Sequence, residues 1–499
     1  MQLITDSQFQ TTQTEVSTNT PFALPISTAE YNYGILKLVT PPSDIDTSPH
    51  IHFIASIDRS GSMCESACGR QYTTSKIHFL KDTLKNMIRW LSEQEDRTFY
   101  ITFIAFDNLI EIPIEYQVVT KERVNELISI VDNIFPRNTT NIELALKTAQ
   151  TIFTKYAKDG LVQSQIFMTD GAITEGSNDI DILKGLIDEN YFQSFIGYGT
   201  SHNDNLLTLL STARKSNYYF VESGENTGMV YGEIINNVVN NMIDNVKITM
   251  SGNSDIEIYN FKKNTWQKAL DIGSMPADIT KIYHIRYKWI YHGPSRRLLS
   301  SAPPLKLPFK LEYIYNDDMV EIEDSIIVNP RTSDSFDDFH GRVAEKYMWR
   351  LKTLEYLYLS ICEHVDQNEL KTFLTNMEEF IERFNLTDDA FMKTICDDIY
   401  IIIRSHNSQL ANMYINARQN SQGYQRAYNT TDISELTHNH NQNYNDYQQS
   451  YGQSMDDYDD VANDALPDED EYYQMSDNTT TSYTNSSQAA IMRNLSQCY

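Results

Sequence analysis

The sequence predicts an α/β protein with a doubly wound, mostly parallel central sheet, followed by a small antiparallel β unit and a helical unit. Between residues 49 and 245, apolar runs alternate with stretches whose apolar residues recur every three or four positions. The runs are apolar on both faces, which is typical of parallel strands covered by helices on both sides. After residue 245 this alternation stops, and short apolar runs bounded by Gly, Pro and Asn follow.

The α/β unit is expected at residues 49–245. Its strands are expected at residues 50–57, 99–106, 165–168, 192–197 and 218–221. Its helices are expected near residues 77–91, 121–134, 141–158, 180–190, 204–216 and 227–243. Each strand is followed by at least one helix, as parallel pairing requires, because parallel neighbours need a crossover connection.

Residues 246–335 are expected to form the accessory β unit, and residues 336–417 the helical unit, with three helices packed on the β unit. A further strand-like run lies within residues 31–48, outside the α/β unit. We expect it to join the β unit, which would bring the N-terminal part of the chain back to the segment that follows the α/β domain.

Both ends of the chain have a different composition. Residues 1–30 are polar and are expected to be flexible. Residues 418–499 hold 13 acidic and three basic residues and are rich in Asn, Gln and Tyr. This composition predicts a disordered acidic tail, because too little apolar surface is present to offset the entropy of ordering. Within that tail, residues 489–497 are a candidate for a short docking helix that folds on contact.

The overall charge and composition narrow the range of functions that the chain can have. The chain has 68 acidic and 40 basic residues and a net charge of −28, which argues against binding nucleic acid or an anionic membrane surface. No apolar run reaches the roughly 18 residues of a membrane span, and the first residues lack the features of a secretion signal. Five cysteines are too few for a disulfide framework. We therefore expect an intracellular, cytoplasmic protein.

Hard oxygen ligands are expected to gather at one edge of the predicted sheet. Asp58, Ser60 and Ser62 follow the first strand, Asp170 follows a later strand, and a third hydroxyl lies in the loop at residues 138–142, which contains Thr139 and Thr140. Because loops at the carboxyl ends of parallel strands meet at the same edge, we expect these side chains to converge there. Carboxylate and hydroxyl oxygens suit Mg²⁺.

The order of these residues along the chain resembles the motif of a von Willebrand factor type A (VWA) domain with a metal-ion-dependent adhesion site (MIDAS). The family pattern is Asp-x-Ser-x-Ser, then Thr, then Asp. The resemblance covers residues 51–221 and implies the Rossmann-like VWA fold. One departure concerns the middle element, where the family often has Gly-Gly before the Thr and this chain has Asn138-Thr139. Thr139 is therefore the alternative to Thr140 as a ligand.

The resemblance implies that Asp58, Ser60, Ser62, Thr140 and Asp170 hold Mg²⁺ (or Mn²⁺), and that an Asp or Glu of a partner protein completes the metal's coordination. It indicates a non-enzymatic interaction protein. Three alternatives remain: a metal that only stabilises the fold, a structural component that self-associates through its acidic tail at the same site, and a metal-dependent hydrolase. For the last, Glu175 is the one extra acid nearby.

Overall fold

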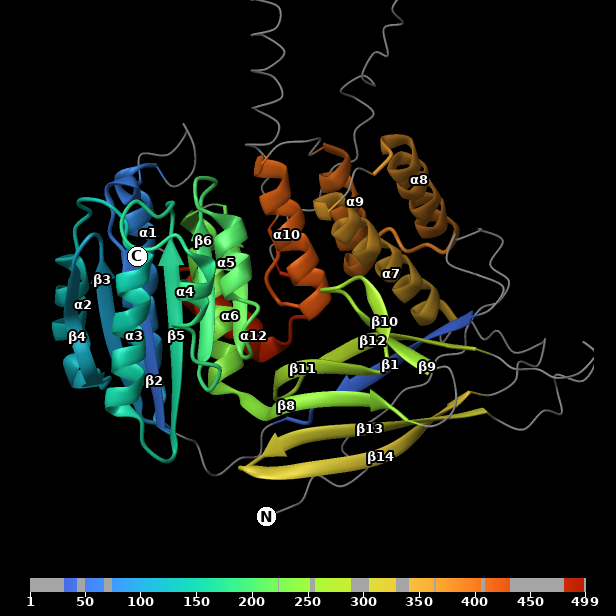
Figure 1. The fold of residues 1–499 in the computed structure, drawn as a ribbon, viewed down its shortest axis with the longest axis horizontal. Coiled ribbons are helices and arrows are strands. Elements are labelled where there is room, and N and C mark those ends of the chain that lie inside the picture. Colours follow the sequence, from blue (N-terminus) through green and yellow to red (C-terminus); the bar gives the residue numbers. More distant parts are fainter. Residues whose placement is uncertain are drawn as a thin grey trace, which may run out of the picture.

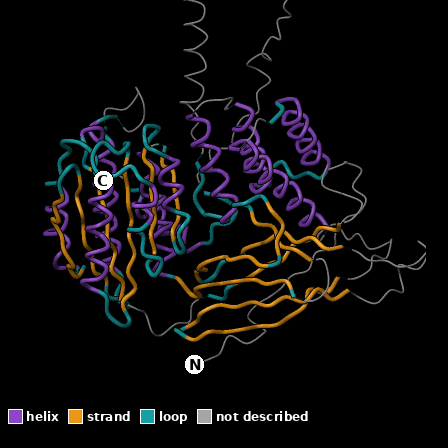
Figure 2. Tube along the Cα trace, in the orientation of Figure 1, coloured by secondary structure: helices purple, strands orange, loops and turns teal. Residues whose placement is uncertain are grey.

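The computed structural model describes residues 31–42, 50–66, 74–222, 224–251, 256–288, 305–328, 341–362, 365–404, 409–430 and 480–497. Figures 1 and 2 show an α/β domain, a β sandwich that lies below and beside it, and a set of helices above the sandwich.

A six-stranded sheet forms the centre of the α/β domain, in the order β4-β3-β2-β5-β6-β7. Its strands are β2 (His50–Asp58), β3 (Phe99–Phe106), β4 (Ile110–Val118), β5 (Leu161–Thr169), β6 (Phe192–Tyr198) and β7 (Ser216–Val221). All neighbours pair in parallel except β3 and β4. The sheet is therefore mixed and mostly parallel, as the buried, two-sided apolar runs predicted.

Strand β4 is the element of this sheet that the sequence did not reveal. It is an edge strand that pairs with β3 alone, and its polar residues alternate with apolar ones around Pro113. A proline is tolerated there because one side of an edge strand has no ladder partner. Its half-exposed pattern lacks the continuous apolar run by which the inner strands were recognised.

Helices cover both faces of the sheet (Figure 1). One face carries α1 (Lys76–Glu93), α2 (Val124–Asp132) and α6 (Thr227–Val239), which share a core with β2 and β3. The other face carries α3 (Ile142–Tyr156), α4 (Ile180–Lys184) and α5 (Asp204–Leu210). Helices α4 and α5 end several residues before the predicted ends at 190 and 216.

Two antiparallel four-stranded sheets form the β sandwich. The first has the order β1 (Tyr31–Val39), β12 (Thr280–Lys288), β9 (Ile256–Asn260) and β10 (Thr265–Gln267). The second has the order β11 (Ala269–Pro276), β8 (Asn241–Met250), β13 (Leu305–Tyr315) and β14 (Asp318–Val328). Their facing side chains, such as Leu36 and Ile285 against Ile248 and Leu311, form one buried core. Strand β1 pairs with β12 along its whole length.

The described part of the helical unit contains four helices where the sequence predicted three. They are α7 (Gly341–Cys362), α8 (Gln367–Arg383), α9 (Ala390–Arg404) and α10 (Gln409–Tyr424). These helices also pack against the α/β domain. The Tyr414 ring of α10 meets the Phe220 ring of β7 edge-on, with 5.2 Å between their centroids, so the unit covers an outer part of the central sheet as well as the sandwich.

The prediction of a disordered tail from 418 to 499 is wrong for two of its parts. Helix α10 and the residues after it run to Thr430, and a further helix, α12 (Ser486–Leu495), packs against α6 and α1. The reason lies in a few apolar residues of α12, Ile491, Met492 and Leu495, which are at most 5% exposed. Residues 431–479, like residues 1–30, lie outside the described part of the chain.

Helix α12 approaches α6 with its backbone. A side-chain carbon added at Gly232 would lie 2.5 Å from the Cα of Met492, and one added at Gly228 would overlap the backbone at Leu495. The Asn86 side chain of α1 donates to the carbonyl oxygens of Leu495 and Gln497, at 3.2 and 2.6 Å. These bonds satisfy carbonyls that a helix end otherwise leaves unpaired.

No helix in the described ranges combines the length and the apolar character that a membrane crossing requires.

Candidate metal centre

The end of strand β2 and the turn that follows it supply the first residues of the centre. Asp58 is the last residue of this strand, and its side chain is wholly buried. The Ser60 backbone amide donates to Asp58 Oδ1 at 2.8 Å, and the Thr169 hydroxyl donates to Oδ2 at 2.5 Å. One turn of 3-10 helix (Gly61–Cys64) follows and places the Ser62 hydroxyl 3.0 Å from that of Ser60.

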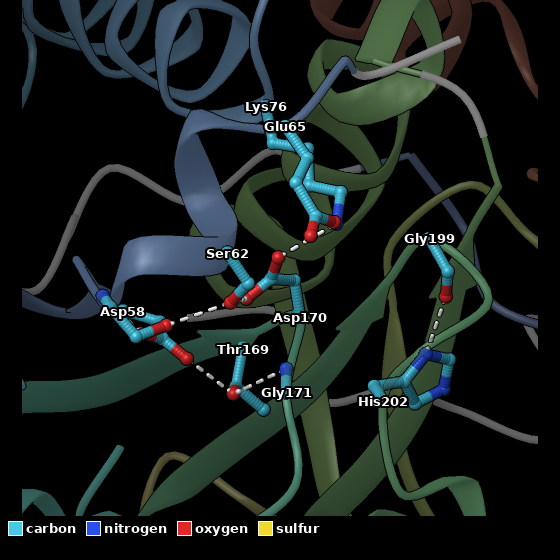
Figure 3. Close-up of polar contacts among 10 residues, drawn as sticks. Asp58, Ser62, Glu65, Lys76, Thr169, Asp170, Gly171, Gly199 and His202 are labelled. Carbon is cyan, nitrogen blue, oxygen red and sulfur yellow. Dashed lines mark hydrogen bonds and ion pairs between the residues drawn. The ribbon is translucent and has the colours of Figure 1, made fainter. Parts of the chain in front are cut away.

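The second carboxylate comes from the neighbouring strand. Because β2 and β5 pair in parallel, with Ile57 opposite Met168, Asp170 follows β5 at the same edge of the sheet. Asp170 is also fully buried, and its Oδ1 accepts a hydrogen bond of 2.7 Å from the Ser62 hydroxyl (Figure 3). Asp58 and the two serines after the first strand are thus brought together with Asp170, which follows another strand.

The third loop brings Thr140 to this group. Thr140 is 3% exposed, and a carbon added at Gly171 would lie 3.5 Å from its Oγ1 and 3.8 Å from Ser62 Oγ. Thr139, by contrast, is exposed and donates its hydroxyl to Glu175 at 2.6 Å. The geometry therefore favours Thr140 over Thr139 as the hydroxyl that faces the centre.

Lys76 is a member of the site that sequence reasoning missed. Its side chain is 7% exposed, and its Nζ lies 2.8 Å from Asp170 Oδ2 and 3.0 Å from Glu65 Oε2 (Figure 3). Burial alone would lower the pKa of Lys76, but the carboxylates of Asp170 and Glu65 together outweigh burial and raise it. A signal was available, because Lys76 is the first residue of α1, where the helix dipole disfavours a cation that has no anionic partner.

A partly buried ion-pair network fixes the Thr140 loop beside the end of β2. The Arg59 and Arg137 side chains both bind Asp107 Oδ2, at 3.1 and 2.8 Å. Burial would raise the pKa of Asp107, but the hydrogen bond from Arg137 and the charge of Arg59 lower it. Backbone bonds complete the link, since the Asn141 amide donates to the carbonyl oxygen of Asp107 at 3.0 Å.

The two buried carboxylates repel each other. Burial, and next the charge of Asp170, raise the pKa of Asp58 to about 6. Within the described residues Lys76 is the only cation that contacts either carboxylate. The centre is therefore short of positive charge, and hydrogen bonds from Ser60 and Thr169 offset this only in part.

The donor set fits a hard divalent cation. It offers two carboxylates and the hydroxyls of Ser60, Ser62 and Thr140, and Mg²⁺ prefers such oxygen ligands. No group of three or more His, Cys, Asp or Glu side chains suited to a metal occurs in the described ranges. A metal at this edge would thus depend on the hydroxyls as well as on the two aspartates.

His202 lies near the centre but is fully engaged elsewhere. Its Nδ1 is 2.6 Å from the Gly199 carbonyl oxygen and its Nε2 is 2.8 Å from the Tyr218 hydroxyl. Burial lowers its pKa to about 4, so the ring is neutral at pH 7. Any side-chain carbon at Gly197 would overlap this ring, which accounts for the glycine near the end of β6.

Comparison with known proteins agrees with this architecture. Residues 53–233 match the family model of the von Willebrand factor type A domain. The chain therefore contains a VWA domain, a class of domain that is generally a protein-interaction module. Comparison with curated proteins finds none that matches.

Two solved structures resemble most of the chain. A von Willebrand factor type A protein from Catenulispora acidiphila is 12% identical and has a TM-score of 0.51, with 84% of this chain and 96% of that one covered. The ArnB paralog VWA2 from Sulfolobus acidocaldarius is 13% identical with a TM-score of 0.43, covering 84% and 98%. The first likeness supports the fold, including parts outside the VWA domain.

Proposed function

We propose that this protein binds partner proteins through a divalent cation, Mg²⁺ or Mn²⁺, held by Asp58, Ser60, Ser62, Thr140 and Asp170. When bound, the ion supplies a positive centre that accepts an Asp or Glu side chain of the partner. The observation that carries the proposal is the convergence of two fully buried carboxylates and three hydroxyls from three loops at one sheet edge.

Lys76 favours an acidic partner. Asp58 and Asp170 carry two negative charges, and the Lys76 ammonium already offsets one of them. A divalent cation therefore leaves the loaded centre with an excess positive charge, because Glu65, the other partner of Lys76, is largely exposed and screened by water. A carboxylate ligand restores neutrality.

A non-enzymatic role fits the surroundings better than hydrolysis. A hydrolase needs a general base within hydrogen-bonding reach of the metal-bound water. The neighbouring imidazole of His202 has both nitrogens engaged by Gly199 and Tyr218. Glu175 is exposed and accepts a hydrogen bond from Thr139, the threonine that faces away from the centre.

Metal binding tests the proposal first. Calorimetric titration with Mg²⁺ and Mn²⁺ should show one site in the full chain and none in Asp58→Asn or Asp170→Asn. A control variant, Asp82→Asn, removes a partly exposed carboxylate that pairs with Lys85 on α1, and should bind the ion normally. If the unaltered chain binds neither ion at millimolar concentration, the proposal is wrong.

Partner binding tests the second step. Proteins captured from lysate in Mg²⁺ should be lost in excess EDTA and should not be captured by Asp58→Asn. If Asp58→Asn has lost the ion, is folded, and still captures the same proteins, the metal only stabilises the domain.

A further inference from the structure

A cleft of about 660 Å³ lies where the α/β domain meets the β sandwich and the segments around α10 and α12. It reaches residues at the start of β6 and β7, such as Phe192 and Ser216, so it lies at the sheet edge opposite the candidate metal centre. Six basic residues line it without a direct carboxylate contact in the described ranges: Arg214, Lys247, Lys262, Lys263, Lys281 and Arg426.

The cleft carries an excess of positive charge in a chain whose net charge is −28. Lys215, a seventh basic residue of the lining, is paired with Asp244 at 3.1 Å. The acidic residues of the lining are Glu189, Glu233 and Asp271. More cations than anions thus face this space.

One of these cations is held in place by its contacts, and another bears an electrostatic cost of burial. The Arg426 guanidinium lies over the Tyr219 ring, 4.0 Å from its centroid, and donates to the Tyr218 carbonyl oxygen. Burial lowers the pKa of Lys281 to about 8, although Glu233 opposes the shift. An anion in the cleft would therefore relieve an electrostatic cost that the folded chain otherwise bears.

The chain itself contains a matching anion. All 13 acidic residues after residue 417 lie within residues 431–479, a stretch without Lys or Arg. Both ends of this stretch are anchored at the cleft. Tyr428 forms an isolated β-bridge with Thr480, and Arg426 and Tyr483, a few residues outside, line the cleft.

We propose that the acidic segment 431–479 binds in this basic cleft of its own chain. A tether of this length spans on the order of 40 Å, so reach alone would also permit the metal centre. Charge favours the cleft whenever the metal centre holds no ion, because the centre then presents two buried carboxylates, whereas six cations of the cleft have no carboxylate contact in the described ranges. Covalent attachment gives an effective concentration on the order of millimolar, which favours binding within one chain. This contact is independent of the proposed metal site.

Competition with a peptide tests the proposal. A full-length variant with every Asp and Glu of 431–479 changed to Asn or Gln keeps the length of the segment and removes its charge. The probe is a fluorescein-labelled peptide of residues 456–471, followed by anisotropy at low ionic strength. The neutralised variant should bind the peptide at least tenfold more tightly than the unaltered chain, where the attached segment competes.

The cleft is then tested in the neutralised variant. Lys247→Ala, Lys262→Ala and Lys263→Ala together should weaken peptide binding at least tenfold, and about 0.5 M NaCl should abolish it. The control combines Lys121→Ala, Lys147→Ala and Lys371→Ala, three exposed lysines outside the cleft, and should leave binding unchanged. EDTA and Asp58→Asn should have no effect.

Several results would overturn the inference. If the neutralised and unaltered chains bind the peptide equally well, the segment does not occupy the cleft. Peptide binding that needs Mg²⁺ and is lost with Asp58→Asn would assign the segment to the metal centre instead. Binding of inorganic tripolyphosphate, with no binding of the peptide, would assign the cleft to another anion. A dimer that neutralisation dissociates would place the contact between two copies.

Discussion

The Lys76 ammonium lies 2.8 Å from Oδ2 of Asp170, inside the group of oxygens proposed to hold the metal. One aspartate of the centre is therefore paired with a cation of the chain itself. The charge of Lys76 therefore has opposite effects on metal binding and on partner binding. The lysine opposes entry of a divalent ion, and it strengthens the attraction of the loaded centre for a carboxylate.

Lys76→Gln is expected to raise the affinity for Mg²⁺ about tenfold or more, because two like unit charges about 4 Å apart repel each other by about 1 kcal/mol in bulk water and about 4 kcal/mol near a protein surface. The same change should weaken binding of an acidic partner at saturating Mg²⁺. Titration calorimetry measures the first effect and capture at fixed Mg²⁺ the second.

The control for this variant is Lys85→Gln, which removes a lysine of the same helix that pairs with Asp82 and Asp132. It should change neither measurement. An unaltered Mg²⁺ affinity in Lys76→Gln would mean that the ion, if bound, lies elsewhere.

Thr140→Val and Thr139→Val separate the two candidate threonines. Thr140 is buried beside Gly171 and Ser62, so its loss should lower Mg²⁺ affinity about tenfold or more. Thr139 instead donates to Glu175 on the exposed side, and its loss should leave the affinity within about twofold. Calorimetric titration of both variants decides, and the reverse order would assign the ligand to Thr139.

Gly232→Ala should destabilise the protein although alanine is the better helix former. The new methyl would lie 2.5 Å from the Cα of Met492, a backbone position that cannot move without displacing α12. Overpacking of this kind costs about 1–3 kcal/mol. Urea unfolding should therefore show a lower midpoint.

Gly185→Ala is the matched control, because its added carbon meets neighbouring carbonyl oxygens no closer than 3.4 Å and the backbone φ is −62°. Its stability should stay the same or rise. Equal effects of the two substitutions would contradict the close packing of α12 on α6.

Acid should weaken the fold through His52. This imidazole is buried between Gln163 and Thr102, at 3.1 and 2.8 Å, and burial lowers its pKa to about 4. In the unfolded chain the pKa is about 6.5, so below that pH the unfolded state takes up the proton first. The stability from the neutral ring is complete above pH 6.5 and declines as the pH falls toward 4.

Between pH 7 and pH 5 the loss from His52 amounts to about 2 kcal/mol at most, at 1.36 kcal/mol for each pH unit below 6.5. In His52→Gln the difference between the unfolding free energies at the two pH values should shrink by up to that amount. His78→Gln, at a side chain 59% exposed, should leave the difference as it is. If His52→Gln leaves it unchanged too, the ring is not buried neutral.

The core of the α/β domain and the main residues of the site could be predicted because they follow from strand ends. A buried parallel strand is visible as an apolar run. Asp58 is the last residue of one such strand, and Asp170 directly follows another. Parallel pairing then brings them to one edge without any knowledge of side-chain contacts.

What the sequence did not reveal depends on contacts between distant residues. Lys76 meets a carboxylate 94 positions away, and nothing in its local pattern names that partner. Helix α12 was expected only as a docking helix, because a few apolar residues follow a long polar stretch. The close packing of α12 on α6 depends on the missing side chains of Gly228 and Gly232. In the sequence these are simply two glycines within a predicted helix, and nothing marks them as contacts of a distant segment.

Because α12 lies near the end of the chain, the surface that it covers is synthesised long before α12 itself. The apolar face of α1 and α6 that Ile491, Met492 and Leu495 cover is made by residue 239, about 250 residues before its cover. A ribosome that adds about 5–20 residues per second needs roughly 10–50 s to cross that interval. During that time the apolar surface of α1 and α6 lacks the cover that α12 gives it in the folded chain. A fragment cut near residue 240 would keep that surface permanently and would be expected to aggregate or to recruit a chaperone.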